Sequence, residues 1–148
     1  MALLFLGAMT AHQFSAAERR VPTYTEAQIK SIADGLCQRL SLQQDIQVSI
    51  SPHNDLMVSV EHVSAQNSYV LSFDREFLNS LSNEELTAAV AHELGHIWIF
   101  SHHPYLQTEP LANEIAMRAV SRQSLTRLYS KLWSHLGTPG NLAEFLGN

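Results

Sequence analysis

The sequence predicts an α+β fold in which a small antiparallel sheet packs on helices, within a single domain spanning residues 18–148. Two observations support this fold class: strand patterns are confined to the first half of the chain, and helix patterns fill the second half. The chain has 148 residues, of which 45% are hydrophobic and 16% are charged. This length and composition are typical of one globular domain with a substantial core.

The N-terminal half begins with a helix and continues with three strands. Thr25 and Gln28 form a capping-box pattern that opens a helix ending at about Leu40. Residues 46–51 then alternate Ile and Val with Gln and Ser, which indicates a half-buried strand. Two further strand patterns cover residues 56–63 and 68–73. Three short strands in succession favour an antiparallel sheet.

The second half of the chain carries helix patterns. A short helix is expected over residues 74–81, and Ser82 with Glu85 forms a second capping-box pattern that opens a longer helix. That helix is expected to end just before Pro104, because the residue preceding a proline disfavours the helical conformation. Two further helices are expected over residues 108–120 and 124–136.

The N-terminal residues have a different character. Residues 2–11 form an apolar run, and small residues follow it at Ala16 and Ala17. The length suits a secretory signal, although no basic residue precedes the run. We expect residues 1–17 to be either a signal peptide of an exported, periplasmic or secreted protein, or an apolar segment packed on the domain of a cytoplasmic one. The run is shorter than the roughly 20 apolar residues that span a bilayer.

Charge and cysteine content exclude several classes of protein. The chain has 14 acidic and 9 basic residues, a formal net charge of −5, and its Lys and Arg residues do not form a stripe. We therefore expect no nucleic-acid partner. The single cysteine, Cys37, excludes an internal disulfide and a cysteine-rich zinc site. Its helical spacing with Ala33 and Leu40 predicts a core residue.

Residues His92 to His96 spell H-E-x-x-H within the long predicted helix. Two histidines four residues apart share a helical face, so both imidazoles can reach one zinc ion. Glu93, one position further round, can then take a proton from a water molecule beside the metal. The motif predicts a zinc-dependent peptide hydrolase with Glu93 as the general base. A purely structural helical protein is the alternative, but it would bury these polar groups unpaired.

A catalytic zinc ion needs a third protein ligand, and Glu109 is the leading candidate. It lies at the start of the next predicted helix, and Asn113, one turn later, can accept a hydrogen bond from a ligand imidazole. His102 is the rival, because it follows His96 with the spacing of zincins that use three histidines. Those proteins leave the helix at a glycine. Here Ile99 occupies that position, so the helix is expected to continue and to carry His102 away from the metal.

Segments around the motif resemble the core of one gluzincin family. That family includes the CAAX prenyl endopeptidases, the bacterial heat-shock membrane protease and the periplasmic chaperone-proteases. The matching segments are YVLSFD (69–74), FLNSLSNEEL (77–86) and AAVAHELGH (88–96). The segment EPLANEIA (109–116) is similar to the family pattern E-x-x-A-D-x-x-A, with Asn113 in place of the aspartate. The stretch between the second histidine and the glutamate is usually longer in the family than residues 97–108 here.

The resemblance implies a minimal, non-polytopic, zincin-like metalloprotease domain with one zinc ion per chain. Its metal ligands would be His92, His96 and Glu109. The function expected is that of a zinc-dependent metalloendopeptidase; the alternative is a non-catalytic zinc-binding chaperone or adaptor module built on the same fold.

The substrate and one further catalytic residue can also be predicted. A polypeptide is expected to bind extended along a strand edge, from residues 56–63 or 68–73. A peripheral membrane contact or a membrane-protein partner is a further alternative for what this chain binds. Tyr105 lies between the second histidine and Glu109 and is the favoured donor to the developing oxyanion. A tyrosine that only packs under the loop is an equally good interpretation.

Overall fold

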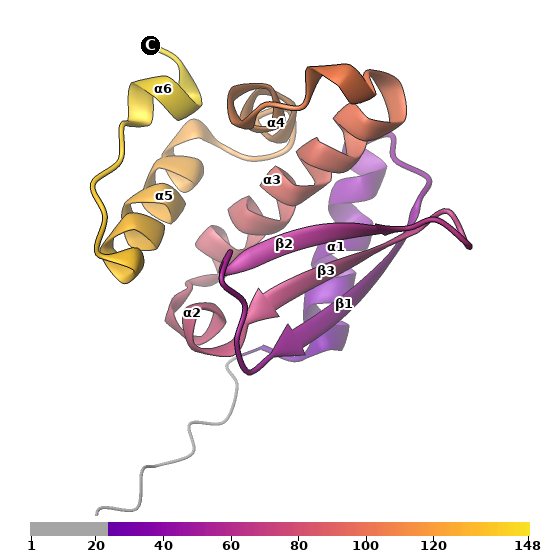
Figure 1. Ribbon diagram of the computed structural model, residues 1–148, viewed down its shortest axis with the longest axis horizontal. Helices are drawn as coiled ribbons and strands as arrows, with labels where there is room; N and C mark the ends of the chain where they lie inside the picture. The colour runs from indigo at the N-terminus through magenta and orange to yellow at the C-terminus, as the bar shows by residue number, and fades with distance from the viewer. Residues whose placement is uncertain (1–23) are drawn as a thin grey trace, which may run out of the picture.

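The computed structural model describes residues 24–148 and has the predicted α+β architecture (Figure 1). The predicted N-terminal segment, residues 1–17, lies outside the described residues. In chain order the elements are α1 (Glu26–Leu40), β1 (Asp45–Ser51), β2 (Val58–Val63), β3 (Ser68–Asp74), α2 (Arg75–Ser80), α3 (Asn83–His102), the 3-10 turn η1 (Pro104–Leu106), α4 (Glu109–Ala116), α5 (Arg122–Leu136) and α6 (Leu142–Leu146).

The three strands form a mixed sheet in the order β1-β3-β2, not the purely antiparallel sheet expected. β2 pairs with β3 in the antiparallel sense, whereas β1 pairs with β3 in the parallel sense, with Asp45 opposite Ser68. The chain does reverse direction from each strand to the next. However, β3 lies between the other two, so its neighbour β1 runs the same way. A pattern of alternating residues specifies the strands but not which of them are adjacent.

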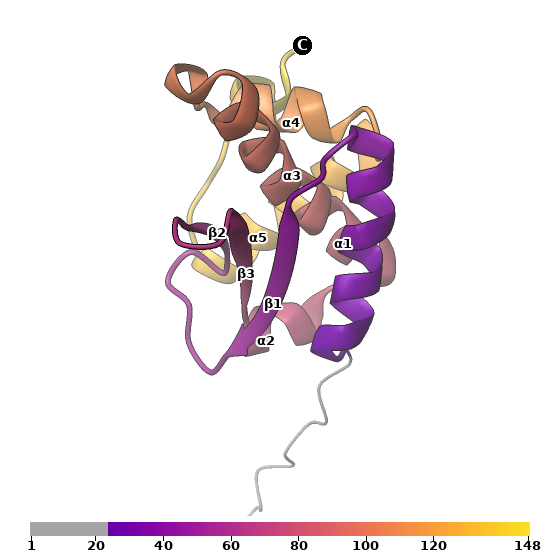
Figure 2. The ribbon, with the colours of Figure 1, turned by 90° about the vertical axis from the view of Figure 1, so that its right-hand side faces the viewer.

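Helices α1 and α3 pack on one face of this sheet, as Figure 2 shows for α1. Both helices begin at the capping boxes predicted for Thr25 and Ser82, each with the reciprocal pair of hydrogen bonds. The core between the layers is built from the apolar stripes of α1 and α3 and from alternate residues of β3; it includes Ile29, Ala33, Cys37, Leu71, Phe73, Leu86, Val90 and Leu94. The predicted burial of Cys37 is therefore confirmed.

The C-terminal third differs in detail from the sequence prediction. α4 ends at Ala116 rather than near residue 120, because the amides of Arg118 and Ala119 turn back to carbonyls only three residues earlier. The five-residue helix α6 was not predicted, since it is too short to show a periodic pattern. None of the helices within residues 24–148 combines the length and the apolar character needed to cross a lipid bilayer.

Candidate metal centre

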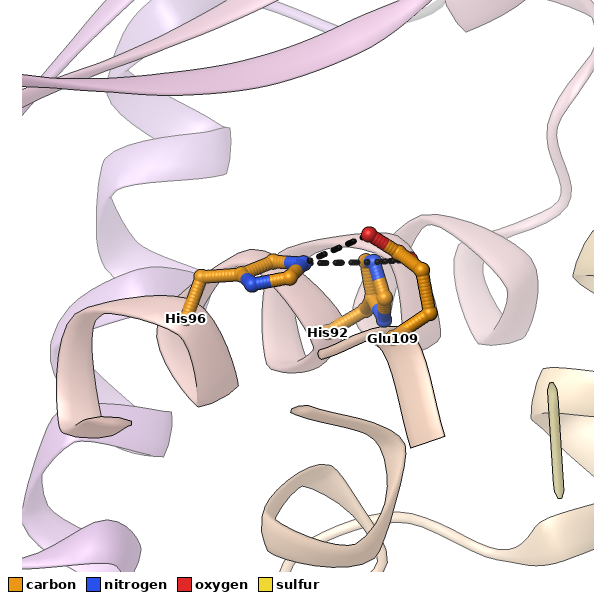
Figure 3. Close-up of side chains that lie close together, drawn as sticks. All are labelled: His92, His96 and Glu109. Carbon is orange, nitrogen blue, oxygen red and sulfur yellow. Dashed lines mark hydrogen bonds and ion pairs between the residues drawn. The ribbon is translucent and has the colours of Figure 1, made fainter. Parts of the chain in front are cut away.

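The two motif histidines and Glu109 converge at the crossing of α3 and α4 (Figure 3). The Nε2 atoms of His92 and His96 are 3.3 Å apart. The Glu109 carboxylate lies against both, with Oε2 at 3.1 Å from His92 Nε2 and Oε1 at 3.3 Å from His96 Nε2. Each of the three residues offers one ligand atom, and these atoms all lie within 4.8 Å of one another. Among residues 24–148, they form the group that could hold a metal ion. The structure thus brings together the three residues predicted as ligands.

Local sequence explains how Glu109 reaches the histidines across so short a connection. Thr108 caps α4 by accepting a hydrogen bond from the Leu111 amide, and Pro110 occupies the first turn, where its missing N–H costs nothing. Gly95 lets α4 approach α3 closely: a Cβ added there would lie 2.3 Å from the carbonyl oxygen of Ala112. Because any larger residue would collide with the α4 backbone, this glycine sets the distance between the two helices.

Each histidine is held by a side-chain amide on the nitrogen that faces away from the cluster. His92 Nδ1 donates to Asn113 Oδ1 at 2.8 Å, and His96 Nδ1 donates to Gln107 Oε1 at 3.0 Å. Both acceptors require a proton on Nδ1, so Nε2, which faces the cluster, is the nitrogen of each ring that would give up its proton to bind a cation. The role predicted for Asn113 is therefore matched by the geometry. Gln107 is a counterpart that the sequence analysis missed, and its amide also donates to the His96 carbonyl at 2.9 Å.

Asn113 connects the cluster to the C-terminal helices. Its side chain is fully buried, and its Nδ2 donates to the Tyr129 hydroxyl at 2.8 Å and to the Phe145 carbonyl at 2.9 Å. The Tyr129 hydroxyl also lies 3.5 Å from His92 Nδ1. Burial raises the pKa of Tyr129, which keeps the phenol protonated. No motif pointed to Tyr129; in the sequence it is one member of the apolar stripe of α5.

Glu93 lies beside the cluster in the wall of a cleft. Its side chain is 7% exposed, and no hydrogen bond joins its carboxylate to another residue within 24–148. Burial raises the pKa of Glu93 above its ordinary value; His92 and His96 oppose this shift, and Glu109 adds to it. A carboxylate with these surroundings is available to accept a proton from a molecule in the cleft.

The charges within the cluster are complementary. The hydrogen bonds from His92 and His96 hold the pKa of Glu109 far below its usual range. Burial on its own would lower the pKa of His96, but the Glu109 carboxylate and Gln107 outweigh it and raise that pKa to about 9. Two imidazole nitrogens and one carboxylate oxygen, open on one side to a cleft, form a donor set that fits a catalytic zinc ion. Cysteine-rich and all-oxygen metal sites are not compatible with it.

The cleft next to the cluster has a volume of about 590 Å³. β2 lines one side of it, α3 forms the floor, and α5 and α6 line the other side; Figure 1 shows these helices on the side of α3 away from α1. The metal ligands and Glu93 all border this space. A molecule in the cleft would therefore contact the cluster directly.

Two residues considered in the sequence analysis lie away from the cluster. α3 continues past Ile99 as predicted, and His102 stacks on Trp98, with 4.0 Å between ring centroids, at the far end of the helix. Tyr105 is 97% exposed and does not border the cleft, so the structure does not place it at the expected position beside a substrate carbonyl. The reason is η1: this tight turn directs Tyr105 outward, and the side chain that the loop sends to the cluster is Gln107.

Comparisons with known proteins support the fold. No protein-family model and no curated protein matches the sequence. Among solved structures, the chain is similar to the crystal structure of the metallopeptidase zymogen of Pyrococcus abyssi abylysin, with a TM-score of 0.55 and 15% sequence identity. The match covers 76% of this chain and 99% of the other. At this identity the likeness concerns the fold alone. The chain is thus an α+β domain with a metallopeptidase-like fold and a candidate His-His-Glu metal site.

Proposed function

We propose that this chain is a zinc-dependent metalloendopeptidase that holds one zinc ion through His92, His96 and Glu109. The observation that carries the proposal is the convergence of these three side chains beside the buried Glu93, whose carboxylate has no hydrogen-bond partner within residues 24–148, all bordering one cleft. The hydrogen bonds from both Nδ1 atoms to amide oxygens support it, because they turn the Nε2 atom of each ring toward the candidate metal position. The metallopeptidase-like fold is consistent with the proposal.

Each residue has a defined task in such a reaction. A bound zinc ion supplies Lewis-acid chemistry, which polarises a peptide carbonyl and lowers the pKa of water toward ~7. Glu93 takes the proton from the attacking water and returns it to the nitrogen of the leaving amine. Asn113 and Gln107 hold the two imidazoles in orientation. The buried setting of Glu93 favours this role, since it brings the pKa of the carboxyl closer to the working pH.

The polypeptide substrate would bind extended along the free edge of β2. Among the strands of residues 24–148, β2 is an outer strand, because β3 pairs with it on one side and β1 lies beyond β3. Val58 and Val60 of this strand border the cleft, opposite the metal ligands. An unpaired strand edge beside a cleft can add a peptide as a further strand through main-chain hydrogen bonds. Such pairing would hold the scissile peptide across the cluster.

The decisive experiment is Glu93→Gln in the zinc-loaded full chain. The substitution preserves size and removes the base, so metal content should stay at one ion per chain while peptidase turnover falls by roughly 10²–10⁴-fold. Glu114→Gln is the matched control, because Glu114 lies exposed on α4 and should leave both unchanged. A wild-type protein that binds one zinc ion but cleaves no peptide would instead favour the non-catalytic zinc-binding module.

A further inference from the structure

Three half-buried residues form an apolar wall on one side of the cleft. Leu132 and Trp133 come from α5, and Phe145 comes from α6. All three border the cleft, and none is fully covered by the rest of the protein. Together these three residues form what we call the apolar wall.

The apolar wall adjoins the metal cluster through a single aromatic ring. The ring centroid of Tyr129 is 5.9 Å from that of His92. On its other side, Tyr129 lies 5.4 Å from Trp133 and 5.2 Å from Phe145. A side chain placed against the wall would therefore belong to a residue close to the peptide bond held at the cluster.

The apolar wall is also held in place by the surrounding structure. The Phe145 carbonyl accepts the hydrogen bond from Asn113, and Arg122 donates to the Leu146 carbonyl at 2.6 Å. Gly140 packs on the indole of Trp133 so closely that a Cβ there would lie 1.9 Å from the ring. A preformed surface of this kind binds without a large ordering cost.

The charges along the cleft limit which substrate side chains can bind against the apolar wall. The acidic and histidine side chains that border the cleft are Glu93, Glu109, His92 and His96 at the metal site and His62 on β2; none of them belongs to the apolar wall, and no Lys, Arg or Asp lines the cleft within residues 24–148. A charged substrate side chain pressed against the wall would lose water without gaining an ionic partner, which is costly. An aromatic or large aliphatic side chain would instead bury apolar area on both sides.

We propose that the apolar wall is a specificity subsite for a bulky apolar side chain adjacent to the scissile peptide bond. The proposal rests on the peptidase function above and names its substrate class: polypeptides cleaved next to Phe, Leu or a similar residue. Pockets of this type discriminate by about 10–200-fold per methylene-sized difference. We expect kcat/KM for a peptide with Phe at the selected position to exceed that for Ala or Asp by about 100-fold.

The test uses a set of fluorogenic octapeptides that differ at one position, which carries Phe, Leu, Ala, Asp or Lys. Trp133→Ala should reduce the preference for Phe over Ala by at least about 10-fold. Leu132→Lys should raise the relative rate for Asp, because it adds a positive charge to the wall. Leu136→Ala is the matched control: Leu136 is on the same helix, is 44% exposed and does not border the cleft. It should keep the wild-type preference.

A binding measurement separates the failure of this inference from the failure of the proposed function. The zinc-loaded Glu93→Gln full chain is titrated calorimetrically with the Phe and Asp peptides. Tighter binding of the Phe peptide, lost in the double variant with Trp133→Ala, supports the subsite even if the wild type shows no turnover. Equal affinity of this variant for both peptides would overturn the subsite. Cleavage of all five peptides by the wild type with equal kcat/KM would also overturn it, and would leave the peptidase function standing.

Discussion

Asn113→Asp tests why this chain has an amide at the position where the family pattern that it resembles has an aspartate. The Asn113 side chain is fully buried and makes three hydrogen bonds: it accepts from His92 at 2.8 Å and donates to Tyr129 at 2.8 Å and to Phe145 at 2.9 Å. A carboxylate preserves the first bond and can make neither donation: the Tyr129 hydroxyl can rotate to donate to the carboxylate instead, whereas the Phe145 carbonyl loses its partner. A buried acceptor left unpaired costs about 1–3 kcal/mol, so we expect the free energy of unfolding to fall by about 1–3 kcal/mol.

The same substitution should affect metal binding much less than Asn113→Ala does. The aspartate variant still offers His92 an acceptor, whereas the alanine variant offers none and should bind zinc about 10–100-fold more weakly. Urea unfolding of the metal-free chain measures stability, hydrogen exchange at the Gly147 amide reports on α6, and competition with a chelating dye measures zinc affinity.

Controls define what would refute this reasoning. Asn148→Asp makes the same chemical change at an exposed position and should leave stability within about 0.5 kcal/mol of the wild type. The loss of unfolding free energy in Asn113→Asp should become smaller as the pH is lowered, because a protonated carboxyl group regains one donor. An unfolding free energy equal to that of the wild type, with unchanged protection of α6, would show that the two donated hydrogen bonds do not account for the amide.

Three further predictions concern the ligand set, the loop tyrosine and the pH dependence of stability. Glu109→Ala should weaken zinc binding strongly, while His102→Ala should barely change it; calorimetry with zinc checks both, and the opposite ranking would contradict the site. Tyr105→Phe should leave kcat unchanged, since the side chain is 97% exposed and does not border the cleft; a loss of kcat of more than about tenfold in steady-state kinetics would contradict this. Burial alone would raise the pKa of Glu85, but the ion pair with Lys131 and the Ser82 hydrogen bonds hold it below its usual value. A depressed folded-state pKa adds stability above the unfolded-state pKa of about 4.3 that is lost as the pH falls through the folded-state value. Glu85→Gln should therefore destabilise the chain by about 1 kcal/mol at pH 7 in urea unfolding, and the difference from wild type should vanish at acidic pH.

The features predicted correctly from the sequence are those that depend on neighbouring residues. Both capping boxes, the long α3 and its continuation past Ile99 follow from local rules of helix formation. The face shared by His92 and His96 follows from the helical repeat alone. Glu109 could be proposed because a short loop leaves its helix few places to pack other than against α3.

The features that the sequence analysis missed depend on contacts between distant segments. Gln107, Tyr129 and Phe145 reach the cluster only once α4, α5 and α6 are packed, and a glutamine in a loop carries no local signal of that role. The order of the strands has the same origin, since residue alternation does not select neighbours. The direction of Tyr105 was unpredictable for a different reason: it depends on the backbone conformation of one short turn.

The close contact between Gly95 and the Ala112 backbone has a consequence for protein design. Grafting His92, His96 and Glu109 onto another pair of helices would reproduce the donor atoms but not their separation, because the interhelical distance here is set by a residue with no side chain. The feature that must be transferred to another scaffold is therefore the helix crossing itself, in which a glycine of the first helix lies against a backbone carbonyl of the second. A design that scaffolds this site should fix that contact first and select its ligand rotamers afterwards.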